Sequence, residues 1–206
     1  MISIDDLMKS GQLATGTTTL ALKTADAIVM ATESQATAGY LVATKNAQKL
    51  FQISDHAAAT ISGGVADCQY VVDQARANAR LKTIETGKEA PLKYIVNIIR
   101  NLLFQGRSYF LSMMLVAGYD VQENALKIFG VDLIGSLFEE EDFLSFGSGS
   151  TYALGVLEAG FKKGLSQKEG IDLARRAVTA AKARDIASGS KIQLAVITKD
   201  GFKQIE

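Results

Sequence analysis

Apolar and polar residues predict two successive rounds of strands followed by helices. Residues 17–23 and 27–33 are strand-like and are separated by the short polar turn "TAD", which is typical of a hairpin. Further strands are expected at 39–44 and 49–62. From Gly64 onward the apolar spacing becomes helical.

Two helices are expected after this first group of strands. Gly87 supplies a C-terminal stop for the first helix, and Pro91 stands where the first turn of the second tolerates a proline. Both helices carry an apolar stripe at helical spacing. The first stripe consists of Val65, Cys68, Val71, Val72 and Ala75, and the second of Leu92, Ile95, Val96, Ile99, Leu102 and Leu103.

Short strands and two more helices make up the second round. The segments "SMMLVAGYD", "ALKIFGVD", "SLFEE" and "DFLSFG" are apolar or alternating and are bounded by Gly or Asp. "GSGSTYALGVLEAGF" opens a third helix, and Ser166 and Glu169 have the capping-box spacing that opens a fourth through Arg184. "KIQLAVITKDGF" closes as a strand and a turn. Two helix pairs separated by strands indicate two sheets that each need helical cover, so we predict an α/β layered sandwich.

Composition narrows the class of protein. With 206 residues, 48% hydrophobic residues and one proline, the chain is long enough for one well-packed domain. Its 22 basic and 22 acidic residues balance, which disfavours nucleic acid as a partner. The single cysteine, Cys68, makes neither an internal disulfide nor a metal site and fits a reducing cytosol. No signal-peptide core and no apolar run of membrane-spanning length occur, so we expect a soluble, cytoplasmic protein.

The stretch "ATGTTTLALK", residues 14–23, combines a Gly-Thr junction with a run of threonines. Such a run alone is typical of an edge strand, because β-branched side chains pack well on a pleated sheet. A threonine hydroxyl becomes a nucleophile only when a base accepts its proton, and the only histidine, His56, is expected at the surface beside Asp55. An α-amino group, with an unperturbed pKa of about 7.7 to 8.0, can accept that proton. Cleavage after Gly16 would therefore make Thr17 both nucleophile and base.

Four further positions gain interest from this idea. Glu33 ends an apolar strand on its alternating face, and Lys49 begins the strand "KLFQI", so a buried charge at either would need a partner. Asp185 and Ser188 lie three residues apart in "ARDIASG", at a helix terminus. Each has a plainer reading as a surface residue at a strand end or as a helix cap, as has the segment "FGSGS".

Taken in order, the motifs "GTTT", "MATE", "NAQKLFQI", "GGVADCQ", "FGSGSTYALGVLE" and "AKARDIASG" resemble the β subunit of the 20S proteasome, and the archaeal type most closely. The resemblance extends from Thr17 to about Phe202. It implies the fold of the N-terminal nucleophile hydrolases, a four-layer αββα sandwich with two antiparallel sheets between helix pairs. It also implies that residues 1–16 are a propeptide removed by self-cleavage at Gly16–Thr17, which leaves a peptidase domain at 17–206.

The resemblance assigns roles to individual residues. Thr17 corresponds to the nucleophile, Lys49 to the lysine whose ammonium lies beside the threonine oxygen, and Glu33 to the carboxylate that pairs with this lysine. Gly63 resembles the glycine whose N–H faces the developing oxyanion, a contribution of about 3 to 4 kcal/mol. The network that positions the threonine end is matched by Ser148, Asp185 and Ser188.

A substrate pocket beside the nucleophile is also implied. Its matching positions are mostly apolar, so a charged substrate side chain would lose its hydration without gaining a partner. We expect a preference for Leu, Tyr or Phe before the cut bond, with Ile61 at the pocket base setting its depth. The matching positions are Ala36, Thr37, Ala47, Ile61 and Val65.

Two positions depart from the family pattern. Ala66 stands where a glycine usually precedes the aspartate and is expected to change only the start of the helix, whereas Gln35 replaces a common basic residue at the rim. Neither change removes a matched catalytic group.

The alternatives are a non-catalytic structural β subunit, which would be expected to lack Thr17 or Lys49, and a proteasome α subunit, which would carry an extra N-terminal helix. A related bacterial peptidase of six-membered rings typically lacks both this leader and "RDIASG".

The resemblance further implies a set of partners. They are copies of the chain in seven-membered β rings, proteasome α subunits, an ATP-dependent unfoldase regulator and unfolded protein substrates. We expect no cofactor and no metal, and the composition argues against nucleic acid and a membrane as partners. Apolar residues in "YIVNIIRNLLF" and "SMMLVAGY" exceed the needs of one core and are interpreted as surface that is buried between subunits.

Overall fold

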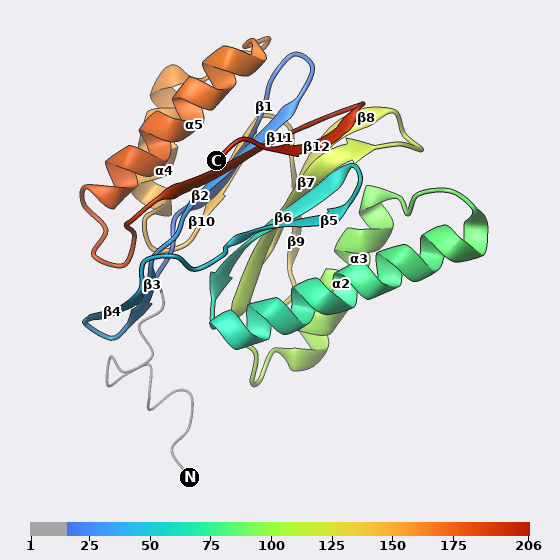
Figure 1. Cartoon of the computed structure of the whole chain (residues 1–206), viewed down its shortest axis with the longest axis horizontal. Coiled ribbons are helices and arrows are strands. Elements are labelled where there is room, and N and C mark those ends of the chain that lie inside the picture. The colour runs from blue at the N-terminus through green and yellow to red at the C-terminus, as the bar shows by residue number, and fades with distance from the viewer. Residues whose placement is uncertain (1–15) are drawn as a thin grey trace.

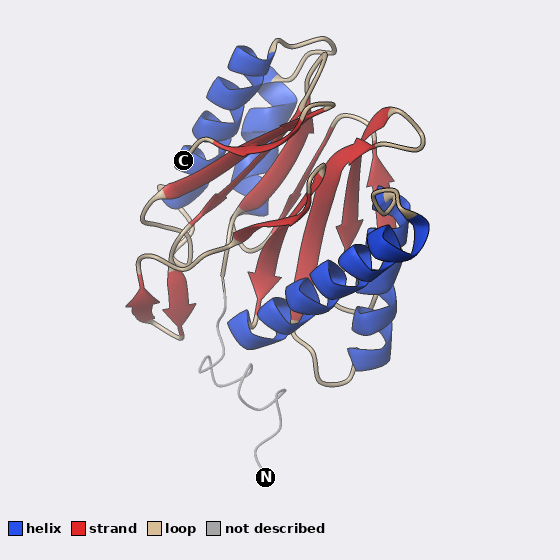
Figure 2. Cartoon of the chain, turned by 45° about the vertical axis from the view of Figure 1, so that its right-hand side comes forward, coloured by secondary structure: helices blue, strands red, loops and turns tan. Residues whose placement is uncertain are grey.

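The computed structural model describes residues 16–206. Two five-stranded antiparallel sheets stack face to face, and each carries a pair of helices on its outer surface (Figure 1). The order of the four layers is therefore helices, sheet, sheet, helices (Figure 2). This confirms the predicted four-layer sandwich.

The first sheet is formed by strands from both ends of the chain and is covered by the last two helices. Its spatial order is β10 (Phe143–Phe146), β1 (Thr19–Lys23), β2 (Ile28–Glu33), β11 (Ile192–Thr198) and β12 (Gly201–Gln204). The helices are α4 (Ser150–Gly160) and α5 (Gln167–Lys182). As the sequence predicts, α5 opens with a capping box between Ser166 and Glu169.

The second sheet follows the order of the chain and is covered by the first two described helices. Its strands are β5 (Leu50–Ser54), β6 (Ala57–Gly63), β7 (Ser112–Asp120), β8 (Ala125–Val131) and β9 (Leu137–Glu140). The helices are α2 (Val65–Thr86) and α3 (Leu92–Gly106). Gly87 ends α2 in the left-handed conformation with φ 66°, the stop that the sequence predicts.

The layer between the sheets explains why the central strands are apolar throughout instead of alternating. On β2, Val29 and Ala31 pack toward α4 and α5, while Ile28 and Met30 pack toward the second sheet. Successive strand residues point to opposite faces, and both faces of these strands are buried. None of the helices within 16–206 combines the length and apolarity that crossing a lipid bilayer would require.

A third, two-stranded sheet was not predicted. It consists of β3 (Ala36–Ala38) and β4 (Leu41–Thr44), joined through Gly39 at φ 60°. This hairpin projects from the body of the sandwich beside the start of β1 (Figure 1). Tyr40 at its tip is 93% exposed.

Three details of the sequence analysis are wrong. The strand expected at 49–62 is two strands, because Asp55 and His56 form a turn. The helix expected to run through Arg184 ends at Lys182. The segment "SMMLVAGY" is β7 and lies almost wholly inside this chain, between neighbouring strands, so it offers no apolar surface for another subunit.

Candidate active site

Residues that are far apart in sequence meet at one end of the sandwich because β1 lies between two antiparallel neighbours. Thr19 at the start of β1 is opposite Thr32 near the end of β2 and Phe146 at the end of β10. The start of β1 therefore lies beside the chain that follows both neighbours. The candidate residues that meet there are Thr17, Glu33, Lys49, Ser148, Asp185 and Ser188.

Lys49 joins the threonine to a buried carboxylate. Its Nζ lies 2.9 Å from Thr17 Oγ1 and 2.5 Å from Glu33 Oε1. Thr17, Glu33 and Lys49 are 3%, 0% and 4% exposed, so water screens these contacts little. The Thr17 hydroxyl thus faces the Lys49 ammonium, and the Glu33 carboxylate balances the charge of that ammonium.

Burial and pairing act on Lys49 in opposite directions. Removal of water from the ammonium lowers the pKa of Lys49, and the neighbouring Glu33 carboxylate raises it by less, so this pKa lies below its ordinary value. Glu33 is held in turn by backbone donors: Oε2 accepts from the N–H groups of Gln35 at 2.6 Å and Gly189 at 3.1 Å, and Oε1 accepts from Thr18 N–H at 3.4 Å. Both carboxylate oxygens therefore have fixed partners.

A second chain of hydrogen bonds reaches the nitrogen of Thr17. The Thr17 N–H donates to Ser148 Oγ at 3.2 Å, and Ser148 donates to Asp185 Oδ2 at 2.6 Å. Ser188 also donates to Asp185 Oδ2, and its oxygen lies 2.7 Å from Thr18 Oγ1. The nitrogen and the hydroxyl of Thr17 are thus held by two separate networks.

The Gly16–Thr17 junction leaves no room for a side chain. A Cβ on Gly16 would lie 1.9 Å from Ala187 Cβ and 2.7 Å from Ser148 Oγ. The Thr17 hydroxyl donates to the Gly16 carbonyl oxygen at 2.7 Å, and Lys49 Nζ lies 3.4 Å from the same oxygen. Hydroxyl, ammonium and carbonyl therefore meet at this one peptide bond.

Gly63 ends β6 in a conformation that suits glycine alone. Its φ is 127°, and a Cβ there would lie 2.2 Å from the Leu111 carbonyl oxygen. The same oxygen accepts a hydrogen bond from Gly64 N–H at 2.6 Å, which holds the two-glycine turn against the start of β7.

The expected pocket residues occupy different elements. Ala36 and Thr37 lie on β3, and Thr37 Oγ1 lies 3.4 Å from the Ala187 carbonyl oxygen beside the site. Ala47 lies in the segment before β5, and Val65 is 41% exposed in the first turn of α2 instead of buried with its apolar stripe. Ile61 is 3% exposed and packs in the core cluster beneath α2, so it can contact a substrate only through a small area.

Two glutamines beside the site were missed or misplaced. Gln35 was expected at the rim, but its side chain is buried and its Nε2 donates to Thr37 Oγ1 and to the Ile186 carbonyl oxygen. Gln193 was not singled out, although it is the one polar residue within the apolar strand "IQLAVI" and contacts the backbone around Lys49. That interruption was the only signal in the sequence.

The other chemistry-bearing side chains lie elsewhere. His56 is half-buried, and its Nδ1 lies 2.5 Å from Glu89 Oε2. Burial raises the pKa of the Cys68 thiol to about 11, which leaves it unreactive. Within the described part of the chain, no group of three or more His, Cys, Asp or Glu side chains is arranged to hold a metal ion.

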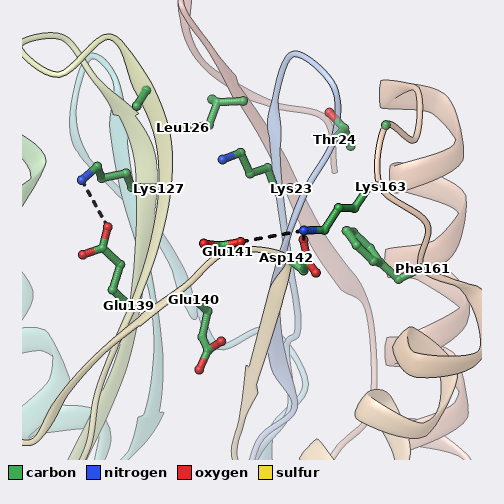
Figure 3. Close-up of a pocket in the computed structure, with 12 residues that line it drawn as sticks. Lys23, Thr24, Leu126, Lys127, Glu139, Glu140, Glu141, Asp142, Phe161 and Lys163 are labelled. Carbon is green, nitrogen blue, oxygen red and sulfur yellow. Dashed lines mark ion pairs between the residues drawn. The ribbon is translucent and has the colours of Figure 1, made fainter.

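A separate hollow of about 480 Å³ opens at the opposite end of β1 (Figure 3). Lys127 pairs there with Glu139, and Lys163 lies within 4 Å of Glu141 and Asp142. Lys23, at the far end of β1 from Thr17, lines this hollow. The hollow is therefore separate from the cluster around Thr17.

Comparison with known proteins identifies the family of this sandwich. The sequence model of the family described as "Proteasome subunit" matches residues 13–197. The chain therefore belongs to the proteasome subunit family, and this confirms the resemblance found in its motifs.

The chain is similar to proteasome β subunits of several archaea. It is 44% identical over 192 residues to proteasome subunit beta of Methanocaldococcus jannaschii, an alignment that covers 93% of this chain and 85% of that protein. It is 41% identical over 204 residues to proteasome subunit beta of Methanococcus aeolicus, with 98% and 93% covered. Proteasome subunit beta 2 of Pyrobaculum islandicum is 39% identical over 190 residues, with 92% and 94% covered.

Proposed function

We propose that this chain is a catalytic β subunit of a 20S proteasome core, an endopeptidase that hydrolyses unfolded proteins with an N-terminal threonine. The observation that carries the proposal is the contact of Thr17 Oγ1 with Lys49 Nζ at 2.9 Å and with the Gly16 carbonyl oxygen at 2.7 Å. A buried hydroxyl beside a lysine and a peptide carbonyl is the arrangement that acyl transfer to a hydroxyl needs.

The first reaction is removal of the chain's own leader. Thr17 Oγ attacks the Gly16 carbonyl carbon, the Gly16–Thr17 C–N bond breaks, and the hydroxyl proton passes to the Thr17 nitrogen. Water then hydrolyses the resulting ester, which releases residues 1–16 with a Gly16 carboxylate and leaves Thr17 with a free hydroxyl and amine. Lys49 Nζ, 3.4 Å from the Gly16 carbonyl oxygen, stabilises the negative charge that develops there.

The same groups then hydrolyse substrates. The new α-amino group accepts the Thr17 hydroxyl proton while the oxygen attacks the substrate carbonyl, and the amine later passes that proton to the leaving amino group. Ser148 and Asp185 hold the nitrogen of Thr17 in place, and Gly63 N–H is the proposed donor to the oxyanion. Water hydrolyses the acyl ester and restores the threonine.

The glycine at the junction gives a first prediction. In Gly16→Ala the new methyl group collides with Ala187, so the junction or the loop must shift, and leader removal is expected to slow by about tenfold to a hundredfold. The matched control is Gly155→Ala, because a Cβ on Gly155 meets nothing within 4 Å. Intact mass during a time course measures the rate, and processing of Gly16→Ala at the normal rate would contradict the geometry.

The division of the chain and its partners belong to the same proposal. Residues 1–15 lie outside the described residues, so the leader at 1–16 and the peptidase domain at 17–206 rest on the junction and on the family. The partners are further copies in seven-membered β rings, proteasome α subunits, and an unfoldase that feeds unfolded chains to the assembled particle. A cytoplasmic location follows from such partners.

The alternative is a non-catalytic structural β subunit of the same particle. The intact set of Thr17, Lys49 and Glu33, in which Lys49 hydrogen-bonds both of the others, favours the catalytic subunit. The bacterial protease of six-membered rings is the less favoured alternative. The similarity of this chain to proteasome β subunits extends over more than nine-tenths of its length.

The test is to follow mass, size and activity together. The chain is expressed with proteasome α subunits and separated by size, and each fraction is assayed for intact mass and for peptide hydrolysis. We expect activity only in large particles whose β chains begin at Thr17. Full specific activity in a monomer peak, or in chains that keep the leader, would refute the proposal.

A second prediction concerns the residue before the cut bond. Burial of an apolar side chain contributes on the order of 1.5 to 3 kcal/mol, so peptides with Leu, Tyr or Phe there are expected to be cut at least about tenfold faster than those with Arg or Glu. The walls expected to do this are Ala36, Thr37, Ala47, Ile61 and Val65. Fluorogenic peptides that differ only in this residue measure the ratio, and faster turnover of the Arg or Glu peptide would sink the assignment.

A further inference from the structure

Gln193 connects the two sheets beside the candidate active site. It lies on β11, in the first sheet, and its Oε1 accepts hydrogen bonds from Lys49 N–H at 2.9 Å and Leu50 N–H at 3.0 Å. Its Nε2 donates to the Ala47 carbonyl oxygen at 2.8 Å. One side chain thus makes three hydrogen bonds to the backbone that leads into β5 of the second sheet.

The backbone that Gln193 holds lies before the regular pairing of β5. Its other bonds attach it to Ser34: Ala47 N–H donates to the Ser34 carbonyl oxygen at 2.9 Å, and Ser34 Oγ donates to the Lys45 carbonyl oxygen at 2.7 Å. Lys45, Asn46 and Gln48 are exposed, and the pairing of β5 with β6 begins only at Leu50 opposite Thr60. Lys49 itself is tied to β6 by one further bond, from Ile61 N–H to its carbonyl oxygen at 3.1 Å. The two N–H bonds to Gln193 therefore fix the point from which the Lys49 side chain extends.

The chemistry of the contact selects an amide. The site presents two N–H donors and one carbonyl acceptor, so its partner must both accept and donate. A carboxylate of the same shape lacks the donor, and a methionine of similar size lacks both functions. Only glutamine has this pair of functions at this side-chain length.

Gln193 also stands in fixed register with the carboxylate that Lys49 meets. On the β2–β11 ladder Gln193 is opposite Thr32, and the preceding Ile192 is opposite Glu33. The position of Glu33 is therefore set by the strand that carries Gln193. The hydrogen bonds of Gln193 to Lys49 N–H and Leu50 N–H then fix Lys49 relative to this strand.

We propose that Gln193 is a positioning residue that holds Lys49 at hydrogen-bond distance from both Thr17 and Glu33. The inference rests on the proposed peptidase function and adds to it a residue outside the set matched by the family motifs. Gln193 touches neither Thr17 nor the Gly16 carbonyl in any hydrogen bond of residues 16–206, so it acts through Lys49.

The experiment compares Gln193→Met with Gln52→Met in assembled particles. Gln52 is an exposed glutamine on β5 whose Nε2 bonds only the neighbouring Ser54 carbonyl oxygen, so it is a matched control. Turnover of a fluorogenic Leu peptide is measured per chain that begins at Thr17 by intact mass. We expect kcat to fall about tenfold or more in Gln193→Met at a KM within about twofold of normal, with Gln52→Met unchanged.

Gln193→Glu is the second variant. It keeps the shape and the acceptor for both N–H groups and loses the donor to Ala47, so its kcat is expected to lie between the normal value and that of Gln193→Met. If Gln193→Met does not assemble, Gln193→Glu decides alone: a lowered kcat at unchanged KM supports the inference. A normal kcat in whichever variant assembles, or an effect confined to KM, overturns it.

Lys49→Met, measured alongside, separates this inference from the function on which it rests. An inactive Lys49→Met together with a fully active Gln193→Met overturns only the role of Gln193. A fully active Lys49→Met overturns the proposed function itself.

Discussion

Replacement of Thr17 by alanine is expected to leave residues 1–16 attached and to reduce peptide hydrolysis to background. The methyl group of alanine cannot attack the Gly16 carbonyl, and the networks around Lys49 and Ser148 contain no other hydroxyl that contacts that carbonyl within the described residues. Intact mass reports the leader, and a fluorogenic peptide assay reports hydrolysis. Thr86→Ala, at an exposed position at the end of α2, is the matched control and should behave normally.

Thr17→Ser completes this experiment, because it keeps the hydroxyl and removes only a methyl group. It is expected to shed the leader and to retain measurable peptidase activity. A Thr17→Ala chain that is trimmed to residue 17 when expressed alone would show that an outside protease cuts the junction, and the self-cleavage mechanism would be wrong.

Replacement of Lys49 by methionine is expected to have the second largest effect. The change removes the cation 2.9 Å from Thr17 Oγ1 with little change in side-chain volume, and peptide hydrolysis should fall by about 10² to 10⁴-fold. It also leaves Glu33 as a buried carboxylate without its cation, which costs on the order of 3 kcal/mol of folding free energy. Activity and stability therefore fall together in this variant.

The double variant Lys49→Met with Glu33→Gln separates these two losses. Neutralising the carboxylate removes the unpaired charge, so the melting temperature should recover most of its loss while hydrolysis stays low. Lys191→Met, which changes an exposed lysine two residues before Gln193, controls for loss of charge near the site. Recovery of hydrolysis in the double variant would mean that Lys49 serves only to balance Glu33.

The sequence predicts those parts of the fold that depend on local pattern. The capping box at Ser166 and the left-handed stop at Gly87 follow from residues within a few positions of each other, and both are present. The order of strands and helices follows from the apolar period. The turn at Asp55 and His56 was missed because the apolar residues on both sides join into one strand-like run.

The candidate site was accessible from the sequence only where a motif carries it. Thr17, Glu33 and Lys49 were singled out by the family motifs, and their contact depends on strand pairing that no local pattern reveals. Gln193 escaped notice because its partners lie more than 140 residues away, on the other sheet. A side-chain bond of this kind becomes visible only when both sheets are in place.

The small side chains in the layer between the sheets affect the active site as much as the reactive groups do. Four of its ten buried residues are alanines, Ala21, Ala58, Ala117 and Ala195, so little side-chain volume separates the facing strands at these positions. Glu33 lies on the first sheet and Lys49 lies at the edge of the second. Their hydrogen bond therefore depends on the distance between the two sheets. The small alanine side chains thus help to set the distance between the sheets. Bulkier side chains at these buried positions would push the sheets apart and separate Glu33 from Lys49, although no substrate reaches these positions.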